Sequence, residues 1–364
     1  MSDKKNFARS LERWFESNKR QLPWRETTDP YLIWVSEIIL QQTRVAQGLD
    51  YYNRFVSRFP DVAALAAATE DEVLKYWEGL GYYSRARNMH AAARQVMRDF
   101  GGRFPDTYEA IRSLKGVGDY TAAAIASFAY GLSHAVVDGN VYRVLSRLFA
   151  VDTPIDTTAG RKLFAALADE WLDRHRPALY NQAIMELGAL QCLPRSPQCP
   201  VCPLAEWCEA AALGRVEDYP VKSGKTEVRP RYFNYLAIRC GGDTFIARRD
   251  GNDIWRNLYE FVLIESDSEL PFEALQQTPS YRNLLGDVSA VVVCPPFVHR
   301  HVLSHRVIYA TFHTLEVPTV PAALTAFRRV AWSDLETFAF ARLTGLYFEW
   351  LNRHDIGSLP LFGG

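Results

Sequence analysis

Four of the six cysteines in this 364-residue chain lie within one stretch of seventeen residues. Cys192, Cys199, Cys202 and Cys208 have the spacing C-x6-C-x2-C-x5-C, with prolines between them that keep the loop extended. Thiolates gathered in this way hold either a tetrahedral zinc ion or an iron–sulfur cube. Zinc sites usually pair two C-x2-C units and this chain has one, so the spacing favours the cube. Disulfides are disfavoured because the N-terminus does not resemble a signal peptide.

A second candidate site is the segment Leu114–Thr121, which joins two helical patterns. Gly116 and Gly118 permit positive φ and leave backbone N–H groups unshielded. The next helix begins at once, so its first amides point into the same space and could grip a phosphate without reading sequence. A plain turn between two helices is the alternative interpretation.

Two acidic residues stand in apolar surroundings. Asp138 follows a pair of valines and precedes Gly-Asn, so it is either a helix N-cap or a carboxylate at the mouth of a cleft. Glu37 lies within the apolar stretch Val35–Ile39, where an unpaired carboxylate is costly. The alternative is a partly exposed Glu37 on an amphipathic helix.

These residues need helices to position them, and residues 1–213 have helical periodicity throughout. The expected landmarks are helix starts at Asp29, at Thr69 (with Glu72) and at Asp106 (with Glu109), a buried helix over Thr121–Ala129, and a helix from about Asn181 to Leu190.

The pattern changes after Leu213. Residues 214–230 are rich in Gly, Pro and charge and have no period, which indicates a linker. Alternation of β-branched and aromatic residues then predicts strands over Tyr232–Arg239, Thr244–Arg248, Ala290–Val293 and His299–Thr314. We therefore expect a multidomain chain, with an all-α part followed by an α+β domain.

Composition adds few constraints. A net charge of −1 does not indicate a nucleic-acid partner, and 48% hydrophobic content is typical of globular proteins. No apolar run approaches the roughly 20 residues that cross a bilayer, so we expect no membrane association. The polar opening of the chain predicts a cytoplasmic location, associated with the nucleoid in a bacterium.

The hairpin, Asp138 and the cysteine loop, in this order, resemble the helix-hairpin-helix DNA glycosylase superfamily, whose members flip a base out of the duplex and cut its glycosidic bond. Within it the chain looks like adenine DNA glycosylases of the MutY type. The resemblance implies a [4Fe–4S] cluster on the four cysteines. It also implies a six-helix domain (25–131), a cluster domain (1–24 and 132–213), a linker (214–230) and a MutT-like, or Nudix-like, domain (231–364).

The resemblance assigns roles in the reaction. The pattern S-E-x-x-L-Q-Q-T makes Glu37 the general acid, and Asp138 would stabilise or trap an oxocarbenium ion. Tyr120 occupies the position where bifunctional endonuclease III relatives have a lysine, so a monofunctional, water-hydrolysing enzyme is implied. Asn140 and Tyr120 would orient Asp138 and the water.

The resemblance also assigns DNA contacts. Gln42 and Tyr82 would enter the base stack and offset the stacking lost on base flipping. The remaining expected contacts in this part of the chain are Thr43, Lys115, Gly116 and Gly118. Packing at a helix end is the alternative for Tyr82.

The C-terminal part resembles a MutT-like domain at Arg248–Phe261, but residues 262–290 contain no R-E-x-x-E-E run, so pyrophosphatase activity is not expected. The resemblance implies recognition of 8-oxoguanine opposite the adenine. The family's F-S-H loop reads Leu303-Ser304-His305 here, with a smaller apolar residue in the first position. A hairpin tip with chance polar residues is the alternative.

The implied function is adenine excision from double-stranded DNA with A:8-oxoguanine or A:G mispairs, by a monomer. Two alternatives stay open. Tyr120 also permits a thymine or pyrimidine mismatch glycosylase of the endonuclease III branch, although the MutT-like domain argues against it. A non-catalytic, DNA-binding redox sensor is disfavoured because Glu37 and Asp138 are both present.

Overall fold

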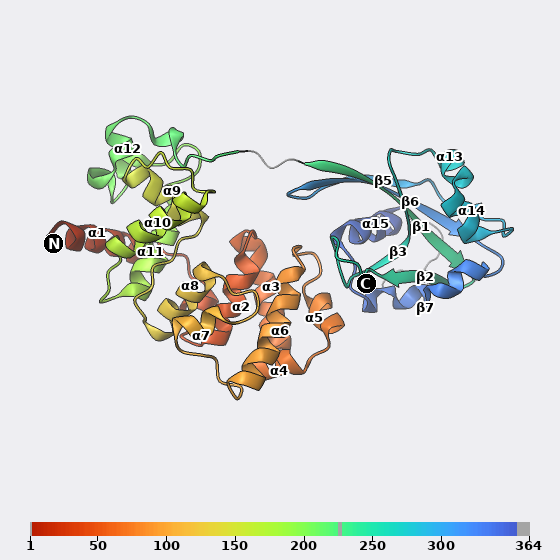
Figure 1. The fold of residues 1–364 in the computed structure, drawn as a ribbon, viewed down its shortest axis with the longest axis horizontal. Helices are drawn as coiled ribbons and strands as arrows, with labels where there is room; N and C mark the ends of the chain where they lie inside the picture. Colours follow the sequence, from red (N-terminus) through yellow and green to blue (C-terminus); the bar gives the residue numbers. More distant parts are fainter. Residues whose placement is uncertain (1, 225–227, 355–364) are drawn as a thin grey trace. The chain divides into compact units, whose positions relative to one another are not determined.

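The computed structural model describes residues 2–224 and 228–354 (Figure 1). The chain divides into two compact units. The first unit comprises residues 1–67 and 88–224, and the second comprises residues 68–87 and 225–364. Among the described residues no helix is long and apolar enough to cross a membrane. The finer division into a six-helix domain and a cluster domain remains a prediction.

Helices account for the first 213 residues, as the sequence predicts. They are α1 (Ser2–Asn18), α2 (Pro30–Leu40), α3 (Val45–Arg58), α4 (Val62–Ala67), α5 (Glu70–Tyr76), α6 (Ser84–Asp99), α7 (Tyr108–Arg112), α8 (Asp119–Tyr130), α9 (Gly139–Leu148), α10 (Thr158–Trp171), α11 (Pro177–Leu190) and α12 (Glu209–Ala212). Of these, α5 and the first turn of α6 belong to the second unit.

Helix α2 begins where the sequence predicts. The Asp29 side chain accepts hydrogen bonds from the backbone N–H groups of Tyr31 and Leu32, and Pro30 occupies the first helical position, where no N–H is needed. The helix is apolar on most sides, and Trp34 is fully buried. It packs against α3 and α8, so it forms the centre of its part of the unit.

Two further helix starts were predicted from capping patterns. The Thr69 hydroxyl accepts from the Glu72 N–H at 3.2 Å, which confirms the first. The second is wrong by one residue, because Thr107, and not Asp106, accepts from the Ala110 N–H at 3.3 Å and caps α7. Thr107 has the extended backbone that a cap requires.

A second helical core lies under the cysteine loop. Helix α11 packs against α1, α8 and α9 (Figure 1). Its buried residues Ile184 and Leu187 join Phe7 and Leu11 of α1 and Val144 of α9 in one cluster. Helix α11 begins at Pro177, a turn earlier than the predicted start near Asn181.

The second unit contains one mixed sheet, in the order β4-β6-β1-β3-β2-β7, with β5 paired to β6. The strands are β1 (Arg229–Cys240), β2 (Asp243–Arg248), β3 (Tyr259–Ser266), β4 (Val291–Val292), β5 (Phe297–Val302), β6 (Arg306–Glu316) and β7 (Arg328–Ala331). The central pair β1–β6 is parallel and the other pairs are antiparallel. Sequence patterns missed β3 and β7, and the run predicted over His299–Thr314 is a hairpin that turns at residues 303–305.

Helices cover both faces of this sheet (Figure 1). Phe233 and Tyr235 of β1 join the core that contains α15 (Arg342–Arg353). Leu236 and Ile238 face the opposite core, with α13 (Phe272–Gln277) and α14 (Pro279–Leu285). Period-two alternation therefore places successive residues in different cores.

A buried ion pair ties the segment after α1 to α11. Both Arg20 and Arg25 donate to the carboxylate of Glu186, whose side chain has no exposed surface. Burial by itself raises the pKa of Glu186, but the hydrogen bonds from the two arginines outweigh it and lower the pKa to about 2.

We expect Arg25→Met to lower the free energy of unfolding by about 3 kcal/mol, because it removes a partner from a buried charge. Lys19→Met, at an exposed pair with Glu16, should cost less than about 1 kcal/mol. Stability from the Glu186 bridge is present above its ordinary pKa of 4.5 and is lost as the pH falls towards 2. Urea unfolding of the wild type and of Arg25→Met at pH 7 and pH 3 measures the loss of unfolding free energy at each pH. An equal loss at the two pH values would contradict a stabilising bridge to ionised Glu186.

Candidate active site and cysteine loop

The carboxyl group of Glu37 is buried on α2. Only 6% of the residue is exposed, and the Tyr120 hydroxyl donates to Glu37 Oε2 at 2.5 Å. Burial raises the pKa of Glu37 to about 7, with a smaller contribution in the same direction from Asp138, while the bond from Tyr120 acts against it. A large fraction of Glu37 is therefore protonated at neutral pH, as a general acid requires.

The carboxylate of Asp138 has a different environment. It caps α9, accepting from the Val141 N–H at 2.7 Å and from Asn140 Nδ2 at 2.9 Å. Burial raises the pKa of Asp138, and these two donors together with the charge of Arg143 oppose that rise. Asp138 is thus both a helix cap and a group at a cleft, so the two interpretations of its sequence are compatible.

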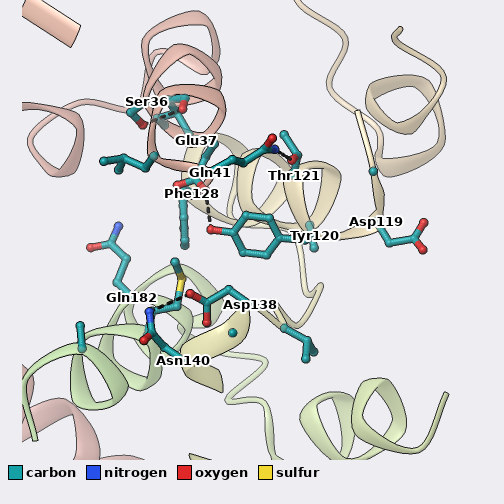
Figure 2. Close-up of a pocket in the computed structure, with 18 of the residues that line it drawn as sticks. Ser36, Glu37, Gln41, Asp119, Tyr120, Thr121, Phe128, Asp138, Asn140 and Gln182 are labelled. Carbon is teal, nitrogen blue, oxygen red and sulfur yellow. Dashed lines mark hydrogen bonds between the residues drawn. The ribbon is translucent and has the colours of Figure 1, made fainter. Parts of the chain in front are cut away.

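One cleft of about 1230 Å³ brings these groups together. Figure 2 shows Glu37 on one side of the cleft and Asp138 with Asn140 on the other. The ring of Tyr120 lies between the two sides. The hydroxyl of Tyr120 bonds to Glu37, whereas Asn140 bonds to Asp138. Orientation of Asp138 by Tyr120, as expected from the resemblance, has no direct bond to support it among the described residues.

The wall of the cleft also contains polar residues that sequence reasoning missed. Arg20, Arg25, Glu186 and Gln182 all line it. No local motif marks the arginines, because their partner Glu186 is more than 160 residues away. Glu186 stands in an apolar helix, as Glu37 does, and that signal could have found it.

The hairpin Leu114–Gly118 has one glycine whose conformation is required. Gly116 has a φ of +76°, and a Cβ there would lie 2.6 Å from Asn88 Cβ. Gly118 has a φ of −94° and caps α8, so it does not use the positive φ that glycine permits. The Lys115 N–H donates to Gln95 Oε1 at 3.1 Å, so any phosphate contact of Lys115 falls to its exposed side chain.

Both residues expected to enter the base stack have unusual backbones. Gln42 has a φ of +58° and Tyr82 a φ of +48°, a region that side chains with a Cβ rarely adopt. Such strain collects at functional sites and persists where the surroundings enforce it. Gln42 and the adjacent Thr43 line the cleft, and Tyr82, in the second unit, is 48% exposed. Their roles on DNA remain predictions.

The four loop cysteines are free thiols that line one small cavity, with apolar residues of α9 and α11 behind them. Among residues 2–224 and 228–354 no three Cys, His, Asp or Glu side chains are gathered to hold a single metal ion. The buried guanidinium of Arg147 lies 3.3 Å from Cys192 Sγ. It also donates to the carbonyl groups of Leu193 and Pro194. A buried cation beside the sulfurs fits a negatively charged set of thiolates around a cluster.

Arg143, one turn before Arg147 on α9, connects the cleft to the cysteine loop. It donates to Asn140 Oδ1 at 2.9 Å, to the Gly188 carbonyl at 2.6 Å and to the Cys192 carbonyl at 2.8 Å. Because Asn140 in turn donates to Asp138, the position of the carboxylate depends on the backbone of the cysteine loop.

In the second unit, the predicted recognition residues form the tip of the β5–β6 hairpin. Leu303 is half-buried against the core that contains α15, and its N–H donates to the Arg306 carbonyl at 2.8 Å. Ser304 and His305 are exposed, with Ser304 Oγ 3.2 Å from His305 Nδ1. Leu303 thus anchors the tip while the two polar side chains are available to a ligand.

Comparison with known proteins agrees with this arrangement. Residues 35–168 match the HhH-GPD superfamily of base excision DNA repair proteins, residues 192–208 match the iron–sulfur binding domain of endonuclease III, and residues 234–350 match the NUDIX domain. A thermostable thymine-DNA glycosylase of known structure is 30% identical, with a TM-score of 0.54 over 58% of this chain and 98% of its own. An endonuclease III–DNA complex, 21% identical over 58% of this chain and 95% of its own, has the same fold with a TM-score of 0.50.

Fold and site together define a helix-hairpin-helix base-excision DNA repair protein with an iron–sulfur cluster and a Nudix-like domain. Adenine DNA glycosylase of Rattus norvegicus is 43% identical over 98% of this chain and 80% of its own length. The enzyme of Buchnera aphidicola subsp. Baizongia pistaciae is 34% identical over 70% and 73%. The chain belongs to the adenine DNA glycosylase family. The predictions of family, fold class and [4Fe–4S] cluster are confirmed.

Gly188 tests the packing that holds Asn140. A Cβ at this position would lie 2.7 Å from Asn140 Cβ and 3.0 Å from the Asn140 carbonyl oxygen. We expect Gly188→Ala to destabilise the fold by about 1–3 kcal/mol, although alanine favours helices. Gly345→Ala, at a helical glycine in α15 with its nearest neighbour 3.6 Å away, should stabilise by up to about 1 kcal/mol. Thermal unfolding of the two variants measures the difference, and equal shifts would contradict the close approach.

Proposed function

We propose that the chain is a monofunctional adenine DNA glycosylase that hydrolyses the N-glycosidic bond of adenine opposite 8-oxoguanine or guanine in duplex DNA. It would act as a monomer, since the first unit by itself contains both carboxyl groups. The proposed location is the cytoplasm. The observation that carries the proposal is a single cleft with Glu37, whose pKa burial raises to about 7, and Asp138, which accepts two hydrogen bonds. Relatives named adenine DNA glycosylase match most of the chain.

The two carboxyl groups divide the work. Glu37 donates its proton to a ring nitrogen of the flipped adenine, which makes the base a better leaving group. The bond between the sugar C1′ and the base then breaks with its electron pair on the base, leaving an oxocarbenium-like sugar. Asp138, ionised, stabilises this cation or forms a bond to C1′ that breaks when water adds there, and the proton that the water loses restores the Glu37 carboxyl group.

Several residues support this chemistry without exchanging protons with the substrate. Asn140 and Arg143 hold the Asp138 carboxylate in place. Tyr120 holds the Glu37 carboxyl group, and a phenol cannot form the imine through which a lysine would cut the strand. The four cysteines would hold the cluster, and the bound cluster would cross-link their loop. The loop would in turn hold α9 through the hydrogen bond from Arg143 to the Cys192 carbonyl.

The hairpin tip Leu303–His305 is proposed to contact 8-oxoguanine. Ser304 and His305 present a hydroxyl and an imidazole at an exposed tip, and both groups can hydrogen-bond to the edge of a base. Leu303 contributes apolar contact with the core and not a stacking ring.

The substrate is tested with duplexes that contain one A:8-oxoguanine, A:G or T:G pair, heated after reaction with and without alkali. We expect adenine release from the first two, with strand cleavage only after alkali. Thymine release would favour the mismatch enzyme of the endonuclease III branch, and direct strand nicking would contradict a monofunctional mechanism.

We expect Glu37→Gln to lower the single-turnover excision rate by about a thousandfold while DNA binding is retained, because it removes only the transferable proton. Glu16→Gln, at an exposed carboxylate of α1, serves as the control. The wild-type rate should fall as the pH rises through about 7, since Glu37 then loses its proton. On the acid side the rate should fall as Asp138 becomes protonated. This fall should begin at a pH above 3.8, because burial raises the pKa of Asp138 from that ordinary value. A rate independent of pH between 6 and 9 would overturn the role of Glu37.

A further inference from the structure

The loop that presents Tyr82 has an unusual backbone. Gly79 and Gly81 have φ values of +92° and +75°, and Tyr82 follows with +48°. The Arg85 guanidinium lies 5.5 Å from the centre of the Tyr82 ring and donates to the Gly81 carbonyl at 3.2 Å. Without external restraint such a loop would relax, so its conformation depends on what holds its two ends.

One restraint comes from the residues before α15. The hydroxyl group of Tyr83, the residue after Tyr82, accepts from the Gly79 N–H and donates to the Phe340 carbonyl, both at 3.2 Å. The Glu78 carboxylate accepts from the Phe340 N–H at 3.1 Å. Phe340 therefore fixes both sides of the loop through one backbone position.

The second restraint comes from a turn at Trp255–Asn257 in the Nudix-like part. Arg87 donates to the Arg256 carbonyl at 2.7 Å, and Asn257 Nδ2 donates to Glu70 Oε1 at 2.5 Å. These bonds hold the segment 68–87 at its start and at its end. The turn is itself strained, since Trp255 and Asn257 have φ values of +58° and +69°.

The same turn contacts the recognition hairpin. The ring of Trp255 lies edge-on to His301 of β5, with 5.9 Å between ring centres. His301 is two residues before Leu303, and both Leu303 and Trp255 pack against the core that contains α15. A displacement of the hairpin tip would therefore be passed through His301 and the shared core to Trp255, in the turn that holds the Tyr82 segment.

We propose that the turn Trp255–Asn257 couples the hairpin Leu303–His305 to the loop of Tyr82, so that reading the base opposite the adenine and entering the base stack are one coupled event. The coupling rests on the proposed function, which makes the first element a reader of 8-oxoguanine and the second a wedge. Trp255, Asn257 and Arg87 are positioning residues, since they act through the residues they hold. The structure supplies two strained elements with direct contacts, and a measured coupling energy is the proof that such a connection requires.

The test uses the full chain with Arg87→Met, which removes the bond to the Arg256 carbonyl, His305→Ala, and the double variant. The preference is the single-turnover rate on A:8-oxoguanine divided by that on A:G. We expect Arg87→Met to lower the preference about fivefold and to add little to His305→Ala.

A second measurement follows the insertion of Tyr82 by the fluorescence of 2-aminopurine placed beside the oxidised guanine. Tyr82→Ala serves as the reference without insertion, and Arg87→Met should reduce the fluorescence response.

Arg353→Met is the matched control, because it removes the same charge from a side chain of the same unit that is 76% exposed. Loss of preference in this control, or single effects that multiply in the double variant, would overturn the coupling. A wild-type fluorescence response without adenine release would contradict the proposed function and leave the coupling intact. If Arg87→Met lowers the unfolding temperature, Asn257→Gly replaces it. Glycine retains the positive φ and removes only the hydrogen bond from the side-chain amide of Asn257 to Glu70.

Discussion

The anchoring of α9 is the constraint on which the rest of the first unit depends. Asp138 caps the start of this helix, and Arg143 and Arg147 follow at intervals of about one turn. Both arginines donate to backbone carbonyl groups of the cysteine loop. A buried guanidinium without such acceptors would be costly, so the loop must be folded for α9 to hold its position. The cysteine loop thereby determines where the Asp138 carboxylate lies, although none of its cysteines lines the cleft.

The chemistry of the cleft follows from unequal solvation of two carboxyl groups. Glu37 receives one hydrogen bond from a phenol and is buried, and burial favours its neutral form. Asp138 receives two donors and lies near the charge of Arg143, which favours its ionised form. In the proposed mechanism the same functional group thus supplies a proton on one side of the cleft and a negative charge on the other.

The second unit solves a different physical problem, which is to keep an exposed aromatic side chain in an unfavourable backbone conformation. Tyr82 is 48% exposed and so gains little stability from its own burial, and the hydrogen bonds of Tyr83 and Arg87, which follow it in the chain, help to enforce the conformation. Their partners Phe340 and Arg256 lie more than 160 residues away in sequence. The helical segment 68–87 is for this reason part of the second unit by its packing, although helices before and after it belong to the first.

Local rules determined much of this protein from sequence. Cysteine spacing, the Asp29 and Thr69 caps, the Gly116 hairpin and the alternation in β1 each involve residues a few positions apart, so their geometry is fixed within a turn or a strand. Sequence could not choose between Asp106 and Thr107 as a cap, because both suit the position. Tertiary structure alone decided that Tyr120 bonds to Glu37, that two arginines meet Glu186, and that Arg256 holds the segment of Tyr82. These contacts join residues 80 or more positions apart, and no periodicity or spacing records which distant side chains a packed core brings together.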